Sequence, residues 1–397
     1  MARSERNAGV FAGLTGDTLK LAIASLFSDI ATEMLYPVLP VFLTQTLGAG
    51  GGVVGLVEGV AVATQNVVQG LSGAISDKLD RRKPVALVGY VVAALAKPLI
   101  GLSGGWVGVL GSRFVDRLGT GIRSAPRDAL IAGSADEAHR GKAFGLEGVG
   151  DNAGAFIGPL IAIGLISLLG GALRPIFYLA AIPGFLAMLM VMLVKERGVH
   201  AGAKAALDAP LPGFPKPYLR YLIASAVFGL GNCSNAFLIL RTRDLGASLD
   251  QTILIYAGFN LVAALASYPA GALSDRFGRR NILALSFVVF FASYLGFGLS
   301  GSPTMIGGLF LLYGLFQGIF RTAGKALAVD LAPATLRASG VGWYGTVVGF
   351  SGLIASLIAG LLWDRAGHPA LFLYGAAFAL AGTLALLLLV SPDRRSA

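Results

Sequence analysis

Apolar runs of about 20 residues recur along the whole chain, and they limit its possible folds more than any other feature. Each run is long enough to cross a hydrocarbon layer about 30 Å thick as a helix. Hydrophobic residues make up 55% of the chain and charged residues only 13%, whereas a soluble domain carries about 25% charged residues. A chain of this composition cannot cover its apolar surface with polar groups, so the sequence predicts a protein of the lipid bilayer.

Splitting the apolar runs at polar breaks and at Gly or Pro turns predicts twelve membrane spans. Strands of a membrane barrel would be about ten residues long and would alternate strictly between apolar and polar residues, which these runs do not. Because lipid offers no partners to backbone N–H and C=O groups, each span is expected to be a helix and the protein all-α. The predicted spans cover residues 19–46, 53–75, 84–103, 105–122, 143–168, 175–194, 219–240, 252–273, 281–300, 305–327, 338–362 and 369–390.

Basic residues are distributed unevenly between the two sides that this topology defines. The loops on the side of the N-terminus carry most of the 31 Lys and Arg residues, whereas the other loops carry only Arg174, Arg241, Arg243 and Arg365. This asymmetry follows the positive-inside rule and predicts that both termini lie in the cytoplasm, with the protein in the inner membrane. It also accounts for the net charge of +10, so no nucleic-acid partner is expected.

A charged phrase occurs twice in the chain. GAISDKLDRR begins at Gly73 and GALSDRFGRR begins at Gly271, 198 residues later. The triplet Leu-Gly-Ala at 47–49 returns at 245–247 with the same offset. Two tandem halves of six spans each are therefore predicted, in one orientation, as in many secondary transporters. We expect a bundle over residues 1–194, a cytoplasmic linker over 195–217 and a second bundle over 218–397.

The doubled phrase resembles the signature loop between helices 2 and 3 of the major facilitator superfamily, Gly-x-x-x-Asp-Arg/Lys-x-Gly-Arg-Arg, and its echo between helices 8 and 9. The resemblance covers essentially the whole chain, and Asp80 stands where the family has Gly. It implies that the loop residues latch the two halves together on the cytoplasmic side in one state and release them in the other. Alternatively, the basic residues only fix the topology. The implied latch comprises Gly73, Asp77, Arg81, Gly271, Asp275 and Arg279.

Ionisable residues within the predicted spans are concentrated in the first half. Each costs about 2.5 to 3.5 kcal/mol at a helix centre on insertion scales, so each calls for a reason. Spans 7, 8, 9, 11 and 12 have none in their central portions. The first half therefore suits protons or ions, and the second half suits a less polar ligand. The intramembrane charges are Asp29, Glu33, Glu58, Lys97, Arg113, Asp116, Arg117, Glu147 and Asp151.

Asp29 and Glu33 lie four residues apart in the first predicted span and share one helix face. Two close carboxylates in a low dielectric cannot both ionise without a large cost, so one of them is expected to exchange a proton. We hypothesise that Asp29 or Glu33 carries a transported proton and that an arginine of span 4 faces Asp29. Pro37 and Pro40 are expected to loosen the helix just beyond the pair.

Span 4 places Arg113, Asp116 and Arg117 on one helix side at spacings of three and four. The segment resembles the family's helix-4 motif, in which an intramembrane Arg before a Gly-rich run serves proton coupling. Either Arg fits, and Arg113 is preferred. The alternative is a buried salt-bridge network that only fixes helix packing, although buried ion pairs are a poor way to gain stability.

Span 5 carries glycines at a spacing of four that allow close helix contact, followed by a proline that allows a bend. Gly154, Gly158 and Pro159 resemble the family's antiporter motif, although Ala162 and Ile163 replace its last two glycines. The motif implies export. Glu147 and Asp151 lie one turn apart in the same span and are expected either to extend a proton route or to pair with Arg or Lys of spans 3 and 4.

The second half offers candidates for substrate contact. The family architecture turns helices 1, 4, 7 and 10 to a central cavity, which makes Asn232, Asn235, Phe316 and Gln317 the first candidates. An aromatic and amide lining suits an amphipathic organic molecule, although each of these residues alone is more often a packing residue.

These features together predict a monomeric transporter that exports a small organic molecule in exchange for protons by rocking two bundles. Its partners are the bilayer, protons and the substrate. No cofactor or enzymatic activity is expected. Nothing resembles a nucleotide-binding P-loop, so ATP is not expected to be the energy source. The rivals are a proton symporter or facilitator for an anionic metabolite bound by Lys97, Arg113 and Arg117, a divalent metal exporter, and a non-transporting receptor. His139, His200 and His368 fall in predicted loops, which argues against a metal site.

Overall fold

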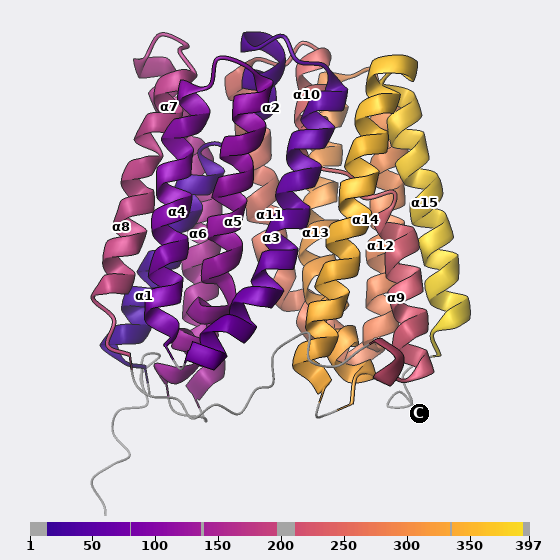
Figure 1. Cartoon of the computed structure of the whole chain (residues 1–397). Helices are drawn as coiled ribbons and strands as arrows, with labels where there is room; N and C mark the ends of the chain where they lie inside the picture. The colour runs from indigo at the N-terminus through magenta and orange to yellow at the C-terminus, as the bar shows by residue number, and fades with distance from the viewer. Residues whose placement is uncertain (1–13, 80, 136–138, 197–210, 334–335, 392–397) are drawn as a thin grey trace, which may run out of the picture.

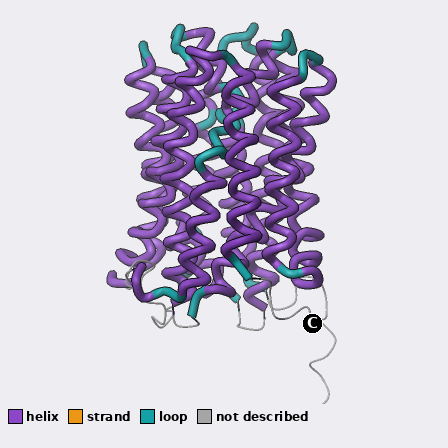
Figure 2. The backbone as a smooth tube through the Cα atoms, turned by 90° about the vertical axis from the view of Figure 1, so that its right-hand side faces the viewer, coloured by secondary structure: helices purple, strands orange, loops and turns teal. Residues whose placement is uncertain are grey.

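The computed structural model describes residues 14–79, 81–135, 139–196, 211–333 and 336–391, and the regular structure in these ranges is helical throughout. The long helices run side by side along one common direction, and most loops lie at the two ends of the bundle (Figures 1 and 2). The helices of the first half are α1 (Gly16–Glu33), α2 (Leu39–Val41), α3 (Gly51–Leu79), α4 (Arg82–Leu102), α5 (Trp106–Gly133), α6 (Arg140–Leu168), α7 (Arg174–Leu179) and α8 (Ala181–Met192). Those of the second half are α9 (Lys216–Gly229), α10 (Ala236–Asp244), α11 (Leu249–Phe277), α12 (Arg279–Leu299), α13 (Pro303–Leu331), α14 (Arg337–Ala366) and α15 (His368–Leu389).

These helices correspond to the twelve predicted spans and confirm the all-α fold with two bundles of six spans. Three spans are interrupted. The first consists of α1, α2 and a π-helix over Phe42–Thr46, the sixth of α7 and α8, and the seventh of α9 and α10. Two of these breaks matter most. Helix α1 ends at Glu33, just before Pro37 and Pro40, and residues 230–235 between α9 and α10 are not helical.

The predicted end of the fourth span at residue 122 is wrong, because α5 continues to Gly133. The apolar run ends near Gly121, but a helix needs only its backbone hydrogen bonds to continue. Pro126 lies inside α5. Arg123, which the sequence placed in a loop, is therefore a helical residue, and its side chain is buried.

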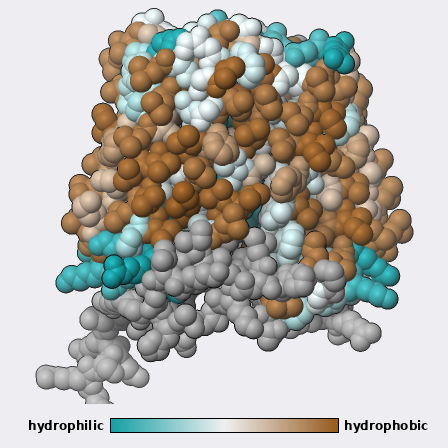
Figure 3. Space-filling model, viewed as in Figure 1, coloured by the Kyte–Doolittle hydropathy of each residue, from teal (hydrophilic) through white to brown (hydrophobic). Residues whose placement is uncertain are grey.

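An apolar belt surrounds the molecule. Large apolar side chains such as Leu168, Tyr268 and Leu388 are more than four-fifths exposed. Brown, apolar surface covers the middle of the molecule in Figure 3, and teal, polar surface gathers towards its ends. Nine stretches of the described residues are long and apolar enough to cross a bilayer. The surface is therefore that of a multi-pass membrane protein, since lipid covers such a belt.

The two ends of the bundle are distinguished by the helices that begin or end there. The terminal face is the end where α1 begins and α15 ends, and the opposite face is the end where α3 and α15 begin (Figure 1). Helices α1–α8 pack mainly with one another, and so do helices α9–α15, while α3 contacts α14 and α6 contacts α11 across the interface. The exact bundle boundaries at residues 194 and 218 stay a prediction.

The bundles are fastened closely at the opposite face. A methyl group added to Gly51 would lie 2.7 Å from the ring of Trp363, and one added to Gly59 would lie 2.8 Å from Leu353. Asp364 at the end of α14 accepts hydrogen bonds of 2.7 Å from the backbone N–H groups of Gly51 and Gly52, and so caps the start of α3. Small residues let the two backbones approach, and a carboxylate suits the positive end of a helix dipole.

Candidate functional site

A buried network of five charges joins α3, α4 and α5. The Nη2 atom of Arg113 lies 3.1 Å from Oε1 of Glu58, and its Nη1 atom lies 3.1 Å from Oδ2 of Asp116. Lys97 Nζ lies 2.8 Å from Asp116 Oδ1. Arg117 Nε lies 3.5 Å from Asp116 Oδ2. These five side chains are at most about a tenth exposed.

The network ties three helices of the first bundle to one another. Asp116 contacts three cations, and Arg113 contacts two carboxylates, those of Glu58 and Asp116. The remaining hydrogen bond of Arg117 goes to the amide oxygen of Gln65, 3.0 Å away on α3. Because every member has partners, the buried charges are compensated, and removing one of them would leave the others exposed to a low dielectric.

The glycine stripe of α6 packs directly on the part of α1 that carries the two predicted proton sites. A methyl group added to Gly154 would lie 2.8 Å from Cβ of Asp29, and one added to Gly158 would lie 3.0 Å from Cβ of Glu33. Pro159 follows within α6. The stripe therefore sets the spacing between α1 and α6 at the carboxylates.

This close packing brings Asp29 of α1 and Asp151 of α6 together. Their carboxyl groups lie within hydrogen-bonding reach of each other. A hydrogen bond between two carboxyl groups needs a proton on one of them, since two carboxylates are acceptors only. Both side chains are half-buried. The pair is consequently a place where one proton can be held between two helices.

Arg123 of α5 is one of the charges near Asp29. Its guanidinium lies 4.6 Å from the ring centroid of Tyr90, and its Nε and Nη1 atoms are buried without a hydrogen-bond partner. The sequence led us to expect Arg113 or Arg117 near Asp29, but Arg113 pairs with Glu58 and Asp116. Sequence reasoning missed Arg123 because the residue follows the apolar run of the span. Its position seven residues after Asp116, two helical turns along the same face, was the available signal.

Glu33 faces the second bundle. The hydroxyl of Tyr256 on α11 donates a hydrogen bond of 2.8 Å to Oε2 of Glu33. The Nδ2 atom of Asn260 lies 3.5 Å from the same oxygen and donates a bond of 3.0 Å to the carbonyl of Ala155. Asp29 and Glu33 share a helix side as expected, but their hydrogen bonds go to different helices.

Tyr36 completes the contact between the bundles at this depth. Its ring stacks on that of Tyr256 with centroids 5.5 Å apart and an angle of 14° between the planes. Its hydroxyl lies 3.2 Å from Oγ of Ser234, which is 198 residues away in the sequence, the offset of the repeat. Residues that occupy equivalent positions in two rotationally related halves can touch only near the rotation axis. Tyr36 and Ser234 therefore mark the axis between the bundles.

Glu147, the other carboxylate of α6, pairs with α5. Its Oε1 atom lies 3.2 Å from Nη1 of Arg127 and accepts a hydrogen bond of 2.8 Å from the hydroxyl of Ser25. Arg127 also contacts Asp128 at 2.9 Å. Of the two roles considered for Glu147, the geometry is that of a carboxylate paired with an arginine of span 4.

The four predicted substrate residues lie in two settings. Asn232 and Asn235 are half-buried in the break between α9 and α10, where the hydroxyl of Tyr313 donates a bond of 2.8 Å to Oδ1 of Asn235. Gln317 is half-buried on α13. Phe316 is fully buried against Phe290, at a centroid distance of 4.9 Å, so it is a packing residue in this conformation.

The latch residues are described for the second copy of the motif. Arg279 lies 3.6 Å from Asp275, 2.9 Å from Asp330 and donates to the carbonyl of Ala326, so this copy contacts α13 of its own bundle. Gly271 lies within α11. In the first copy, Gly73 lies within α3, Arg81 is exposed before α4, and the side chain of Asp77 lies outside the described residues.

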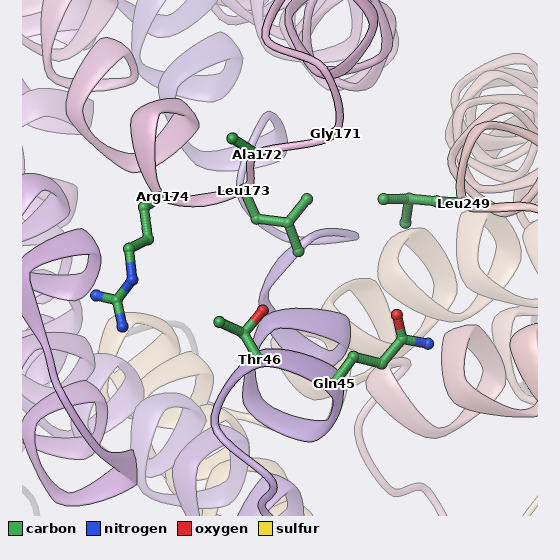
Figure 4. Close-up of a pocket in the computed structure, with 7 residues that line it drawn as sticks. All are labelled: Gln45, Thr46, Gly171, Ala172, Leu173, Arg174 and Leu249. Atoms are coloured by element: carbon green, nitrogen blue, oxygen red, sulfur yellow. The ribbon is translucent and has the colours of Figure 1, made fainter.

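A pocket at the opposite face contains none of the predicted site residues. Figure 4 shows its lining, in which the guanidinium of Arg174 turns away from Leu249 and Gln45. That guanidinium donates hydrogen bonds of 2.6 and 2.9 Å to the carbonyls of Gly101 and Ser103. Arg174 therefore braces the loop after α4 and is not free for a ligand. Within the described ranges, no group of three or more His, Cys, Asp and Glu residues is arranged to hold a metal ion.

Comparisons with known proteins agree with this architecture. The sequence model of the Major Facilitator Superfamily matches residues 21–240 and 221–397. An uncharacterized MFS-type transporter of Methanocaldococcus jannaschii is 34% identical over 380 residues, which span 94% of this chain and 95% of the relative. The multidrug resistance protein MdtG of Enterobacter lignolyticus is 27% identical over 323 residues, or 77% of this chain and 76% of the relative. The nucleoside transporter NupG has a similar solved structure, with a TM-score of 0.81 and 15% identity over 95% of this chain and all of that chain.

Proposed function

Because the chain belongs to the Major Facilitator Superfamily, we propose that this transporter is a proton-coupled antiporter that exports a small organic molecule. The terminal face lies in the cytoplasm, and the protein resides in the inner membrane. The two bundles rock about the axis marked by Tyr36 and Ser234, so that a central site opens to one side at a time.

The observation that carries the proposal is the contact between Asp29 and Asp151. The two residues belong to different spans of the first bundle, and the glycine stripe of α6 holds them together. The unpartnered nitrogens of Arg123 stand close enough for their charge to act on Asp29. When the shared proton leaves, the second negative charge is attracted to Arg123, and when a proton returns, the attraction weakens.

Two observations support the direction of transport. Gly154, Gly158 and Pro159 fit the start of the antiporter motif, and they pack on α1 at the proton-exchanging carboxylates. One relative is named a multidrug resistance protein. An exporter of this kind takes up a proton on the outer side, releases it to the cytoplasm and carries its substrate in the opposite direction.

The second candidate function is a symporter or facilitator for an anionic metabolite. Arg321 and Lys325 of α13 favour it, because both are exposed and neither has an ion-pair partner among the described residues. Lys97 and Arg113, which the sequence also offers as anion-binding residues, are paired with Asp116 and Glu58, respectively.

Purified protein in liposomes tests the proposal. A pH-sensitive dye inside the liposomes is read while drugs, metabolites, organic anions and divalent metal ions are added one at a time. Antiport predicts that an added substrate drives protons in the opposite direction to its own movement. Proton movement in the same direction would establish symport, and a response to no compound would contradict both candidate functions.

A further inference from the structure

Glu33 is the carboxylate of the first bundle that is hydrogen-bonded to the second bundle. Among the described residues, the other hydrogen bonds across the interface join Tyr36 to Ser234, Asn260 to Ala155, and the start of α3 to Asp364. Asp29, Glu58 and Asp116 have partners in their own bundle. A proton on Glu33 therefore directly changes the hydrogen bonds that α11 makes to α1.

The two donors to Glu33 come from one face of α11. Tyr256 and Asn260 lie four residues apart, one helical turn, and both reach the same oxygen, Oε2. Asn260 uses its amide group a second time, for the carbonyl of Ala155 on α6. Through these two side chains, α11 is hydrogen-bonded to α1 and α6 at the level where Gly154 and Gly158 let those two helices pack closely.

The charges around Glu33 come from several elements. Arg117 of α5 and Arg321 of α13 act on it. Asp29 and Tyr36 of its own span are near, with Asp29 in turn next to Asp151 of α6. Arg117 and Arg321 belong to different bundles, so rocking changes the distance between them. The hydrogen bonds from Tyr256 and Asn260 act only at short range, so rocking either keeps them or breaks them.

We propose that Tyr256 and Asn260 are positioning residues that couple the occupancy of Glu33 to the rocking of the bundles. When Glu33 is ionised and no substrate is bound, both donors hold α11 against α1 and α6 and keep the opposite face closed. A proton on Glu33, or a hydrogen-bond donor of the substrate that takes the place of Tyr256, releases α11 and lets the opposite face open. The inference rests on the proposed antiport function, and it predicts that the carrier does not change its orientation while Glu33 is ionised and no substrate is bound.

The physical reason is the strength of a hydrogen bond to an ionised acceptor. Such bonds are worth more than bonds between neutral groups, and losing one shifts an equilibrium roughly 10- to 100-fold. The bonds exist only where α11 lies against α1, so they favour one conformation. By linkage, a conformation that favours ionised Glu33 is itself favoured when Glu33 is ionised.

The first test measures conformation as a function of pH without any substrate. Spin labels are placed on Ala172→Cys and Ser302→Cys, two exposed loop positions of different bundles at the opposite face, in a Cys233→Ala background. In nanodiscs, lowering the pH should lengthen the distance between the labels in the otherwise unchanged chain. Tyr256→Phe should lower the ratio of short to long distances at high pH roughly 10- to 100-fold. Asn260→Ala should lower it less, because its amide nitrogen lies 3.5 Å from Glu33, and Glu33→Gln should remove most of the pH response.

The second test measures coupling. In liposomes with an imposed pH gradient and no substrate, Tyr256→Phe and Asn260→Ala should increase the proton leak several-fold, since an empty carrier that reorients completes a cycle with the protonated one. Tyr268→Phe and Asn281→Ala serve as matched controls, because Tyr268 is exposed on the same helix and Asn281 is exposed and donates its hydrogen bond to the carbonyl of Phe277 at the end of α11, within the second bundle. Tyr256→Phe keeps the ring that stacks on Tyr36, and Asn260→Ala provides an independent variant should the first one misfold.

The two outcomes can be told apart. Wild-type distances and wild-type leak in both folded variants, together with substrate-driven proton movement in the unchanged protein, would overturn the inference and leave the antiport proposal standing. An absence of substrate-driven proton movement in the unchanged protein would instead overturn the antiport proposal.

Discussion

The two bundles are related by a repeat, yet their interiors are stabilised in different ways. In the first bundle, Glu58, Lys97, Arg113, Asp116 and Arg117 form a buried ionic network. In the second bundle, aromatic rings fill the equivalent interior, with Phe228 and Phe287 stacked at 3.8 Å and Phe290 and Tyr294 at 3.9 Å. Ionic contacts are costly to bury, but their strength changes when a proton arrives. Aromatic contacts do not titrate as pairs and keep one geometry.

This difference suggests a division of labour. The first bundle can change its internal charge during a transport cycle, and the second can act as a rigid partner that responds to the change. Glu33, Tyr256 and Asn260 lie where the two kinds of interior meet. The predictions below test whether the bundles differ in this way, beginning with the largest expected effect.

Replacing Asp116 should have the largest effect on stability. Asp116→Asn removes the carboxylate that three cations share, and it leaves Lys97 and the two arginines with fewer compensating charges. Breaking a buried ion network in this way costs about 3 to 5 kcal/mol. The free energy of unfolding, measured in mixed detergent micelles, should fall by that amount. Asp128→Asn is the control, because its side chain is 43% exposed. Equal stability of the two variants would refute the idea that charges hold the first bundle.

Enlarging Gly154 should have an intermediate effect. In Gly154→Ala the new methyl group would lie 2.6 Å from the carbonyl oxygen of Leu26 and 2.8 Å from Cβ of Asp29, so α1 and α6 must separate. Overpacking of this kind costs about 1 to 3 kcal/mol, and it should also weaken proton-driven transport. Gly164→Ala on the same helix is the matched control, because a methyl group there would meet nothing within 4 Å. Similar transport by both variants would mean that the stripe does not position Asp29.

Truncating a ring of the second bundle should have the smallest effect. Phe290→Leu removes ring contacts with Phe228, Tyr294 and Phe316. Losing favourable aromatic pair geometry costs about 0.5 to 1.5 kcal/mol beyond the change in buried area. The unfolding free energy should fall slightly, and the pH dependence of transport should stay the same. A changed pH dependence would show that the second bundle takes part in proton exchange, contrary to the comparison.

Much of the architecture followed from the sequence, because span length, loop charge and the repeat are local properties. The twelve spans and the two-bundle fold were predicted, and so were the breaks near Pro37 and the clustering of charge in the first bundle. The spacing of Arg113, Asp116 and Arg117 correctly placed them on one side of a helix, because helical periodicity alone determines it.

The partners of these residues could not be predicted in the same way. Which residue a side chain meets depends on the rotation of each helix about its own axis, and a helix that is apolar all round carries little signal of it. The hydrogen bonds of Glu33 to Tyr256 and Asn260 and the contact between Asp29 and Asp151 arise from that rotation. One interhelical contact does have a sequence signal. Glycines recur at a spacing of four on α3, at Gly51, Gly55 and Gly59, and α14 packs closely against them.

The central claim, that carboxylates of the first bundle exchange the transported proton, is tested most directly by pH-gradient-driven transport in liposomes. Asp29→Asn, Glu33→Gln and the double variant are compared with Asp250→Asn, whose side chain is exposed at the start of α11. The account predicts that the control matches the unchanged protein, that each single variant loses most of its gradient-driven transport, and that the double variant loses all of it. Gradient-driven transport that is undiminished in the double variant would contradict the account.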